Sequence, residues 1–203
     1  MVEKVKKAFP HVIVVMNVGG IVDTKWFRDC DEIQSVLMAW QGGMEGGLAT
    51  ADILCGDVNP SGKLSDTYAK DLEDYPSTAN FHESAFYVDY TEDIYVGYRY
   101  YETRYEDTVL GQGNASTADS EYDYTKQVQY PFGYGISYTQ FGYSDFSLTE
   151  NGDNFTAQVT VTNNGDVAGK DVVEVYFQSP YTDYDRENLV ENQLLSFADL
   201  QNR

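Results

Sequence analysis

The chain has 203 residues, with 33 Asp and Glu against 13 Lys and Arg, and a formal net charge of −20 at pH 7. This charge repels nucleic acids and anionic membranes, so we expect neither as a partner. No apolar run approaches the ~18 residues that a membrane span needs. The first ten residues lack the apolar core of a signal peptide, so the sequence carries no export signal and predicts a cytoplasmic location.

Aromatic residues are unusually frequent, with 18 Tyr, 10 Phe and 2 Trp making up 15% of the chain. An acidic, tyrosine-rich surface suits sugars, because sugar rings stack on aromatic faces and sugar hydroxyls bond to carboxylates. Tyrosines that fill β-sheet faces explain the same composition. The two cysteines, Cys30 and Cys55, are too few and too far apart for a disulfide framework or a metal site. We expect buried or half-buried free thiols, no metal and no cofactor.

Residues 1–40 predict one half of an α/β unit. Residues 1–9 form an amphipathic pattern that ends at a proline. Residues 11–18 and 33–40 are continuous apolar runs, typical of strands buried on both faces by helices. Residues 21–30 between them predict a short helix. A strand, a helix and a strand in this order predict a right-handed crossover and a parallel sheet.

A glycine-rich segment, residues 40–64, follows the second strand. Two glycine pairs directly after Trp40 predict a tight turn, since glycine adopts backbone angles that a Cβ forbids. Residues 48–55 have helical spacing, and Gly56 is a typical end for that helix. The Asn-Pro-Ser-Gly sequence at residues 59–62 predicts a turn.

Residues 66–129 predict little regular structure. Residues 81–90 are irregular and aromatic, and residues 90–102 are dense in tyrosine. The polar stretch 106–126 has the composition of a surface insertion. Residues 130–138 predict a compact aromatic turn.

From Phe141 onward the apolar residues repeat every second position. A hairpin turn is predicted at residues 150–154, followed by a strand over 155–162 whose odd-numbered residues share one face, a second turn, and a third strand over 171–177. Three antiparallel strands form the first half of a β-sandwich, which needs about seven. We therefore expect an incomplete sandwich.

Five segments together resemble a known family. Four of them are similar to the C-terminal region of glycoside hydrolase family 3 and occur in the family's order: Trp40–Gly47, Gly56–Leu64, Tyr90–Glu102 and Tyr130–Tyr138. The fifth, Asn163–Tyr176, is similar to the fibronectin-III-like module that follows this region. The resemblance implies an α/β fold: an N-terminally truncated, partial parallel-sheet α/β sandwich over residues 1–140, then an incomplete fibronectin-III-like antiparallel β-sandwich over residues 141–203.

The same resemblance implies a retaining β-glycosidase, most often a β-glucosidase, that acts on β-linked oligosaccharides or glycosides in carbohydrate catabolism. Such enzymes use a carboxylate nucleophile and a carboxylic acid/base. In the family the nucleophile is an Asp on a separate (β/α)8 domain, and the acid/base Glu lies in a loop before the strand that matches residues 11–18. Neither maps onto this chain. We therefore expect no catalytic residue in this chain. The expected partners of the chain are the (β/α)8 domain and the substrate. The substrate-binding residues stay unassigned.

Four residues were considered as catalytic candidates. Glu45 lies between two glycine pairs, but a general acid needs a partner carboxylate at ~5 Å, and a helix N-terminus favours the ionised form. A structural role is therefore predicted for Glu45. For Glu92 and Asp93, which lie among tyrosines, a solvated acidic loop is favoured over a substrate contact. His82 has no nearby nucleophile pattern in the sequence.

Three hypotheses follow: a supporting part of a family 3 glycosidase, a non-catalytic carbohydrate-binding or adhesion module, and an enzyme with relocated carboxylates. The incomplete sandwich favours the first, because a chain that folds alone would complete its core. An uncovered sandwich face also favours a homo-oligomer.

Overall fold

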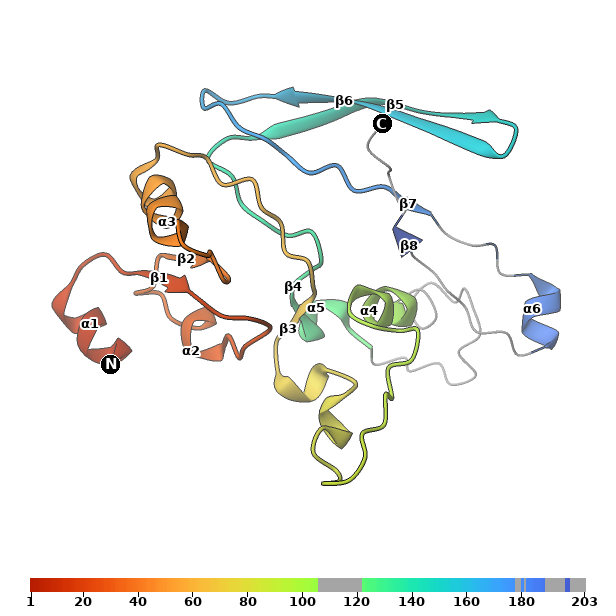
Figure 1. The fold of residues 1–203 in the computed structure, drawn as a ribbon, viewed down its shortest axis with the longest axis horizontal. Coiled ribbons are helices and arrows are strands. Elements are labelled where there is room, and N and C mark those ends of the chain that lie inside the picture. Colours follow the sequence, from red (N-terminus) through yellow and green to blue (C-terminus); the bar gives the residue numbers. More distant parts are fainter. Residues whose placement is uncertain (106–121, 178–179, 181, 189–195, 198–203) are drawn as a thin grey trace. The chain divides into compact units, whose positions relative to one another are not determined.

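Figure 1 shows the fold in a computed structural model, which describes residues 1–105, 122–177, 180, 182–188 and 196–197. The chain divides into two compact units, which are described separately. The first comprises residues 1–41, 64–134 and 174–203, and the second residues 42–63 and 135–173. The expected domain boundary at residue 140 stays a prediction. None of the described helices is long and apolar enough to cross a bilayer.

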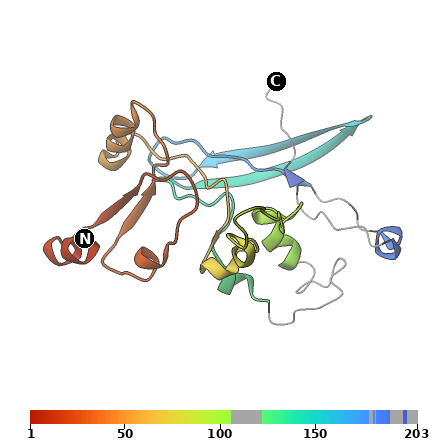
Figure 2. The same ribbon diagram turned by 60° about the horizontal axis from the view of Figure 1, so that its bottom comes forward.

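The first unit begins with helix α1 (Val2–Ala8) and a small parallel sheet. Strand β1 (Ile13–Met16) pairs with β2 (Ser35–Met38), with helix α2 (Lys25–Arg28) between them along the chain (Figures 1 and 2). The prediction of two neighbouring parallel strands joined by a short helix is confirmed.

Burial of β1 on both faces was predicted and is wrong. Side chains of a strand alternate between its faces, and here one set is buried, at Val12 and Met16, while Ile13 and Val15 are 52% and 41% exposed. Within the described residues this sheet has two strands, and one of its faces is left largely uncovered. An apolar run in the sequence shows that a strand can be buried, but it does not show whether one or both faces of the sheet are covered by other elements.

A second small sheet joins β3 (Tyr68–Ala69) to β4 (Val128–Tyr130) in antiparallel register. Around it lie four short helices: η1 (Leu72–Asp74), η2 (Thr78–Asn80), α4 (Tyr98–Tyr105) and α5 (Tyr124–Gln127). The expectation of little regular structure over residues 66–129 holds for residues 81–97, which form no helix or strand, but it missed α4, α5 and the β3–β4 pair. Residues 106–121 lie outside the described part.

The core of this region is built on Tyr101, which is 1% exposed and packs with Ala69 and Val128. Its hydroxyl donates to the Asp74 carbonyl oxygen at 3.0 Å, and its own carbonyl oxygen accepts from the Tyr122 hydroxyl at 3.0 Å. Because both polar groups are paired, the ring can be buried without an unsatisfied donor.

The second unit contains helix α3 (Gly46–Cys55), which ends at Gly56 with φ of 82°. A Cβ on Gly42 would lie 2.8 Å from the Gly46 Cα, so the chain passes itself there at a distance that only glycine allows. The predicted glycine turn, helix and glycine stop are confirmed. Cys30 and Cys55 are free, and Cys30 is half-buried as expected, whereas Cys55 is exposed, contrary to the expectation.

A long hairpin completes the second unit. Strands β5 (Phe141–Asn151) and β6 (Asn154–Asn163) pair antiparallel across the predicted turn, with a register shift between Ser144 and Ser147. Figure 2 shows the two strands side by side. The register places one apolar set on the same face: Tyr143, Phe146, Leu148, Phe155, Ala157, Val159 and Val161.

The predicted third strand over residues 171–177 is wrong in extent and in partner. Residues 171–175 form no strand, and β7 (Tyr176–Phe177) pairs with β8 (Ser196–Phe197) instead of the hairpin. Helix α6 (Asp183–Glu187) lies between β7 and β8 along the chain. Valine and aromatic content favours an extended backbone, but a strand forms only where a partner edge is available.

Substitution of Tyr101 tests the tyrosine core. We expect Tyr101→Ala to lower the free energy of unfolding by about 3–5 kcal/mol, as for other buried rings. Tyr101→Phe should cost about 1 kcal/mol, since it removes one hydrogen bond. Urea unfolding followed by circular dichroism measures both, with the exposed Tyr90→Ala as a control. An unchanged midpoint for Tyr101→Ala would contradict this core.

The apolar face of the hairpin predicts self-association. Phe146, Leu148 and Phe155 are all more than half exposed, and both strands have an unpaired edge among the described residues. We expect Phe155→Glu to shift the chain toward monomer. Thr156→Glu adds the same charge on the opposite face and should not. Analytical ultracentrifugation measures the distribution, and a wild-type chain that is monomeric throughout would refute the prediction.

Candidate functional site

The glycine turn brings Glu45 to the start of α3 without burying it. Glu45 is exposed, and its side chain makes no capping hydrogen bond to the helix. A general acid of a glycosidase works from a site that raises its pKa by burial or a like charge. An exposed carboxylate at a helix start has neither feature. The structural role expected for Glu45 stays a prediction.

The Asn-Pro-Ser-Gly-Lys turn of the second unit is held by the side chain of Asn59. Its Nδ2 donates to the Ala168 carbonyl oxygen at 3.2 Å. Its Oδ1 accepts from the Ser137 hydroxyl at 2.9 Å and the Tyr138 backbone N–H at 2.8 Å. One side chain thus joins the turn to two distant segments, and its bonds leave it little capacity for a ligand.

Lys63 makes a similar connection from the end of the same turn. Its ammonium donates to the Gly135 carbonyl oxygen at 2.8 Å and lies 3.2 Å from Asp171 Oδ1. The Tyr143 hydroxyl also donates to the Asp171 carboxylate. Burial alone would raise the pKa of Asp171, but the hydrogen bonds from Tyr143 and Lys63 outweigh it and hold that pKa below its usual value.

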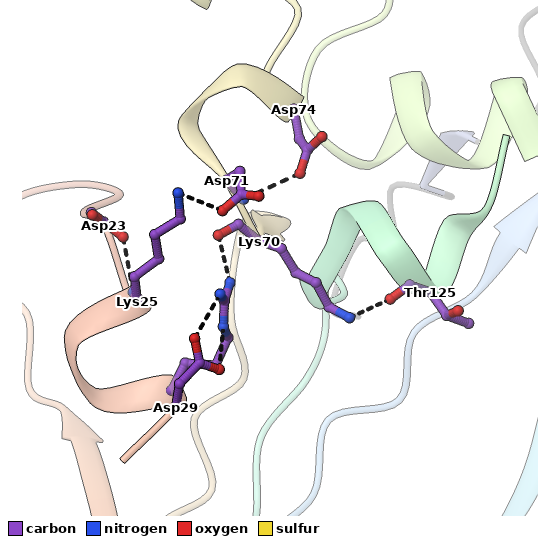
Figure 3. A network of polar contacts seen from close by, with 8 residues as sticks. Asp23, Lys25, Asp29, Lys70, Asp71, Asp74 and Thr125 are labelled. Carbon is purple, nitrogen blue, oxygen red and sulfur yellow. Dashed lines mark hydrogen bonds and ion pairs between the residues drawn. The ribbon is translucent and has the colours of Figure 1, made fainter. Parts of the chain in front are cut away.

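In the first unit, charged side chains connect α2 to β3 and η1 (Figure 3). Arg28 donates to the Lys70 carbonyl oxygen at 2.6 Å and to Asp29, and Lys25 lies 2.7 Å from Asp71. Asp71 also begins η1 in a reciprocal capping arrangement with Asp74. These groups are joined to one another, so the network is a structural connection and not an open binding site.

The candidates in the tyrosine-rich segment are not brought together as a catalytic pair. Asp93 is exposed with φ of 47°, and Glu92 is half-buried. His82 has φ of 90° and contacts the Phe81 ring at 4.4 Å between ring centroids. No nucleophile or second carboxylate accompanies any of them in a described hydrogen bond.

The sequence reasoning missed a group of residues on α4. Tyr124 donates to Glu102 at 2.7 Å. The Arg104 guanidinium lies 5.9 Å and 5.2 Å from the ring centroids of Tyr100 and Tyr122, and it donates to the Tyr100 hydroxyl. The spacing of three and four residues among the tyrosines of α4 was the signal that could have revealed this helix.

Two described carboxyl groups have raised pKa values. Burial raises the pKa of Asp66, although its carboxylate accepts a hydrogen bond from the Thr67 N–H. Burial also raises the pKa of Asp74, although its carboxylate accepts a hydrogen bond from the Asp71 N–H, and the nearby Asp71 and Glu73 carboxylates raise it further. Within the described ranges, no group of three or more His, Cys, Asp and Glu is placed to hold a metal ion. The side chains described above supply packing and polar connections. The expectation that this chain carries no catalytic residue stays a prediction.

Comparison with known proteins identifies the family. Residues 1–98 match the Glycosyl hydrolase family 3 C-terminal domain. This part of the chain belongs to the family. It is 53% identical over 195 residues to "Beta-glucosidase A" of Butyrivibrio fibrisolvens and 42% identical over 181 residues to "Beta-glucosidase" of Ruminococcus albus, each alignment covering 89% of this chain. It spans 21% and 17% of those two proteins, about a fifth of their length.

Solved structures agree with this family. The β-glucosidase from Paenibacillus barengoltzii matches with a TM-score of 0.74 and 39% identity, over 97% of this chain and 19% of that one. The β-glucosidase from Kluyveromyces marxianus in complex with glucose matches with a TM-score of 0.72 and 36% identity, over 97% of this chain and 20% of that one. The expected family is therefore confirmed, and the similarity to these structures covers 97% of this chain, so it extends well beyond residue 98.

The contacts of Asp171 predict a pH dependence. Its folded pKa lies below the usual value of 3.8, so its contribution to stability is present above that value and is lost as the pH falls through the folded pKa. We expect Asp171→Asn to lower the melting temperature at pH 6 and to differ less from wild type near pH 3. Thermal melts at both pH values measure this, with the exposed Asp153→Asn as control. Equal differences at the two pH values would count against the prediction.

Proposed function

We propose that this chain forms part of a retaining β-glucosidase, in which it supports the fold and helps to shape the sugar site. The observation that carries the proposal is 53% identity over 89% of the chain to a protein named β-glucosidase, of which it spans 21%. The likeness to a β-glucosidase in complex with glucose supports a β-linked glucoside as the substrate. Residues from 141 onward would correspond to the start of a fibronectin-III-like module.

The mechanism by which a glycosidase retains the configuration of the sugar indicates where the catalytic pair of such an enzyme would lie. A retaining glycosidase needs two carboxyl groups about 5–5.5 Å apart, one as nucleophile and one as acid/base. Two half-buried acids are bound to local groups: Asp66 to the Thr67 N–H and Asp74 to the Asp71 N–H. In the proposed enzyme a (β/α)8 domain carries the nucleophile, and this chain positions loops around the sugar.

A non-catalytic carbohydrate-binding or adhesion module is the second candidate. Exposed aromatic residues favour it, because such rings are the usual contacts for sugar faces. The gene around this segment separates the two candidates: a flanking (β/α)8 domain supports the β-glucosidase, and its absence from the gene supports the stand-alone module.

Hydrolysis of p-nitrophenyl β-D-glucoside tests the proposal. We expect no turnover by the 203-residue chain alone, since a retaining enzyme without its nucleophile loses nearly all of its rate. The full polypeptide that the gene encodes should hydrolyse the substrate. Turnover by the chain alone that disappears in Glu45→Gln would refute the proposal and identify an enzyme with relocated carboxylates.

A further inference from the structure

Residues 81–96 form an exposed acidic aromatic strip between η2 and α4, the yellow-green stretch in Figure 1. Phe86 is 97% exposed and Tyr90 is 88% exposed, and Phe81 and Tyr87 are also more than half exposed. Exposed rings gathered within one short segment mark a binding surface more often than scattered ones do.

The side chain of Asn80 makes hydrogen bonds to residues in the second half of the strip. Its Nδ2 donates to the Asp89 carbonyl oxygen at 2.9 Å, and its Oδ1 accepts from the Thr91 hydroxyl at 3.4 Å. Its own carbonyl oxygen accepts from the Glu83 N–H at 3.1 Å. These bonds join residues on both sides of Phe86 and Tyr87, so the rings lie in a loop whose ends are held together.

The charge of this region restricts what it can bind. Residues 71–98 contain no Lys or Arg, while their acidic residues are Asp71, Glu73, Asp74, Glu83, Asp89, Glu92 and Asp93. An ionised carboxylate only accepts hydrogen bonds. An anionic ligand is repelled from this segment, and so is the same acidic segment of a second copy. The complementary ligand offers donors and apolar faces.

We propose that the strip binds a β-linked glucan, an inference that rests on the proposed function and names the polymer that this segment holds. Each glucose ring has an apolar face that stacks on an aromatic ring, and hydroxyl donors at its edge for carboxylates such as Asp89 and Glu92. A cationic protein segment also supplies donors, but the core of a protein interface is depleted in Asp and Glu. Here the acids alternate with the aromatic residues along the chain, which favours the sugar.

Calorimetric titration of the 203-residue chain with cellohexaose tests the proposal. We expect binding that is insensitive to salt and that weakens about tenfold in each of Phe86→Ala and Tyr90→Ala, the loss of one stacked ring. Tyr90→Phe keeps the ring and should bind like wild type. Tyr184→Ala, which removes an exposed tyrosine outside the strip, is the matched control. Circular dichroism checks that each variant is folded.

Three results would overturn the proposal: no binding of cellohexaose by the wild-type chain, equal binding by the ring variants, or salt-sensitive binding of polylysine in place of the glucan. Asp89→Asn gives a second test. Asn80 binds only the backbone oxygen of Asp89, so this substitution leaves that hydrogen bond in place, and weaker glucan binding by the variant supports a role of the Asp89 carboxylate in the strip. Glucoside hydrolysis by the full polypeptide is assayed separately. Hydrolysis without glucan binding would refute the binding role of the strip and leave the proposed function intact. Glucan binding without hydrolysis would refute the proposed β-glucosidase function.

Discussion

Burial of the Tyr101 ring is the interaction on which the β3–β4 region of the first unit depends. The strands that it covers, β3 and β4, have two and three residues, and so short a pair is not stable in water without a packed face. The ring supplies that face against Ala69 and Val128, and its hydroxyl reaches the Asp74 carbonyl oxygen, which fixes η1 to α4. The same hydrogen bond holds α4, which follows the strip along the chain, to η1.

The second unit uses polar side chains for the same purpose. Asn59 and Lys63 bind backbone groups near residues 135–138 and 168, and Asp171 closes the connection through Lys63. The segments that identify the family in the sequence are therefore largely the ones that hold the described structure together. The family segments therefore have a structural role in the described residues, and the expectation of no catalytic residue in this chain stays a prediction.

Local patterns predicted the elements whose partners lie nearby in the sequence. Two apolar runs gave the parallel strands β1 and β2, and an Asn-Gly turn in an alternating pattern gave the hairpin. Helix α3 followed from its glycine boundaries. Burial of β1 and the pairing of residues 171–177 depend on distant segments, which no local pattern describes. The Tyr101 core escaped prediction because strands of two or three residues have no detectable period.

Hydrogen–deuterium exchange tests most directly whether the tyrosine core is the stable centre of this chain. The account predicts the slowest exchange in the N–H groups of β3, β4 and α4, including the Ala69 N–H that donates to the Tyr75 hydroxyl at 2.8 Å. It predicts fast exchange along the hairpin, where most side chains are exposed. Hairpin amides protected as strongly as those of β3 and β4 in a monomeric sample would contradict it.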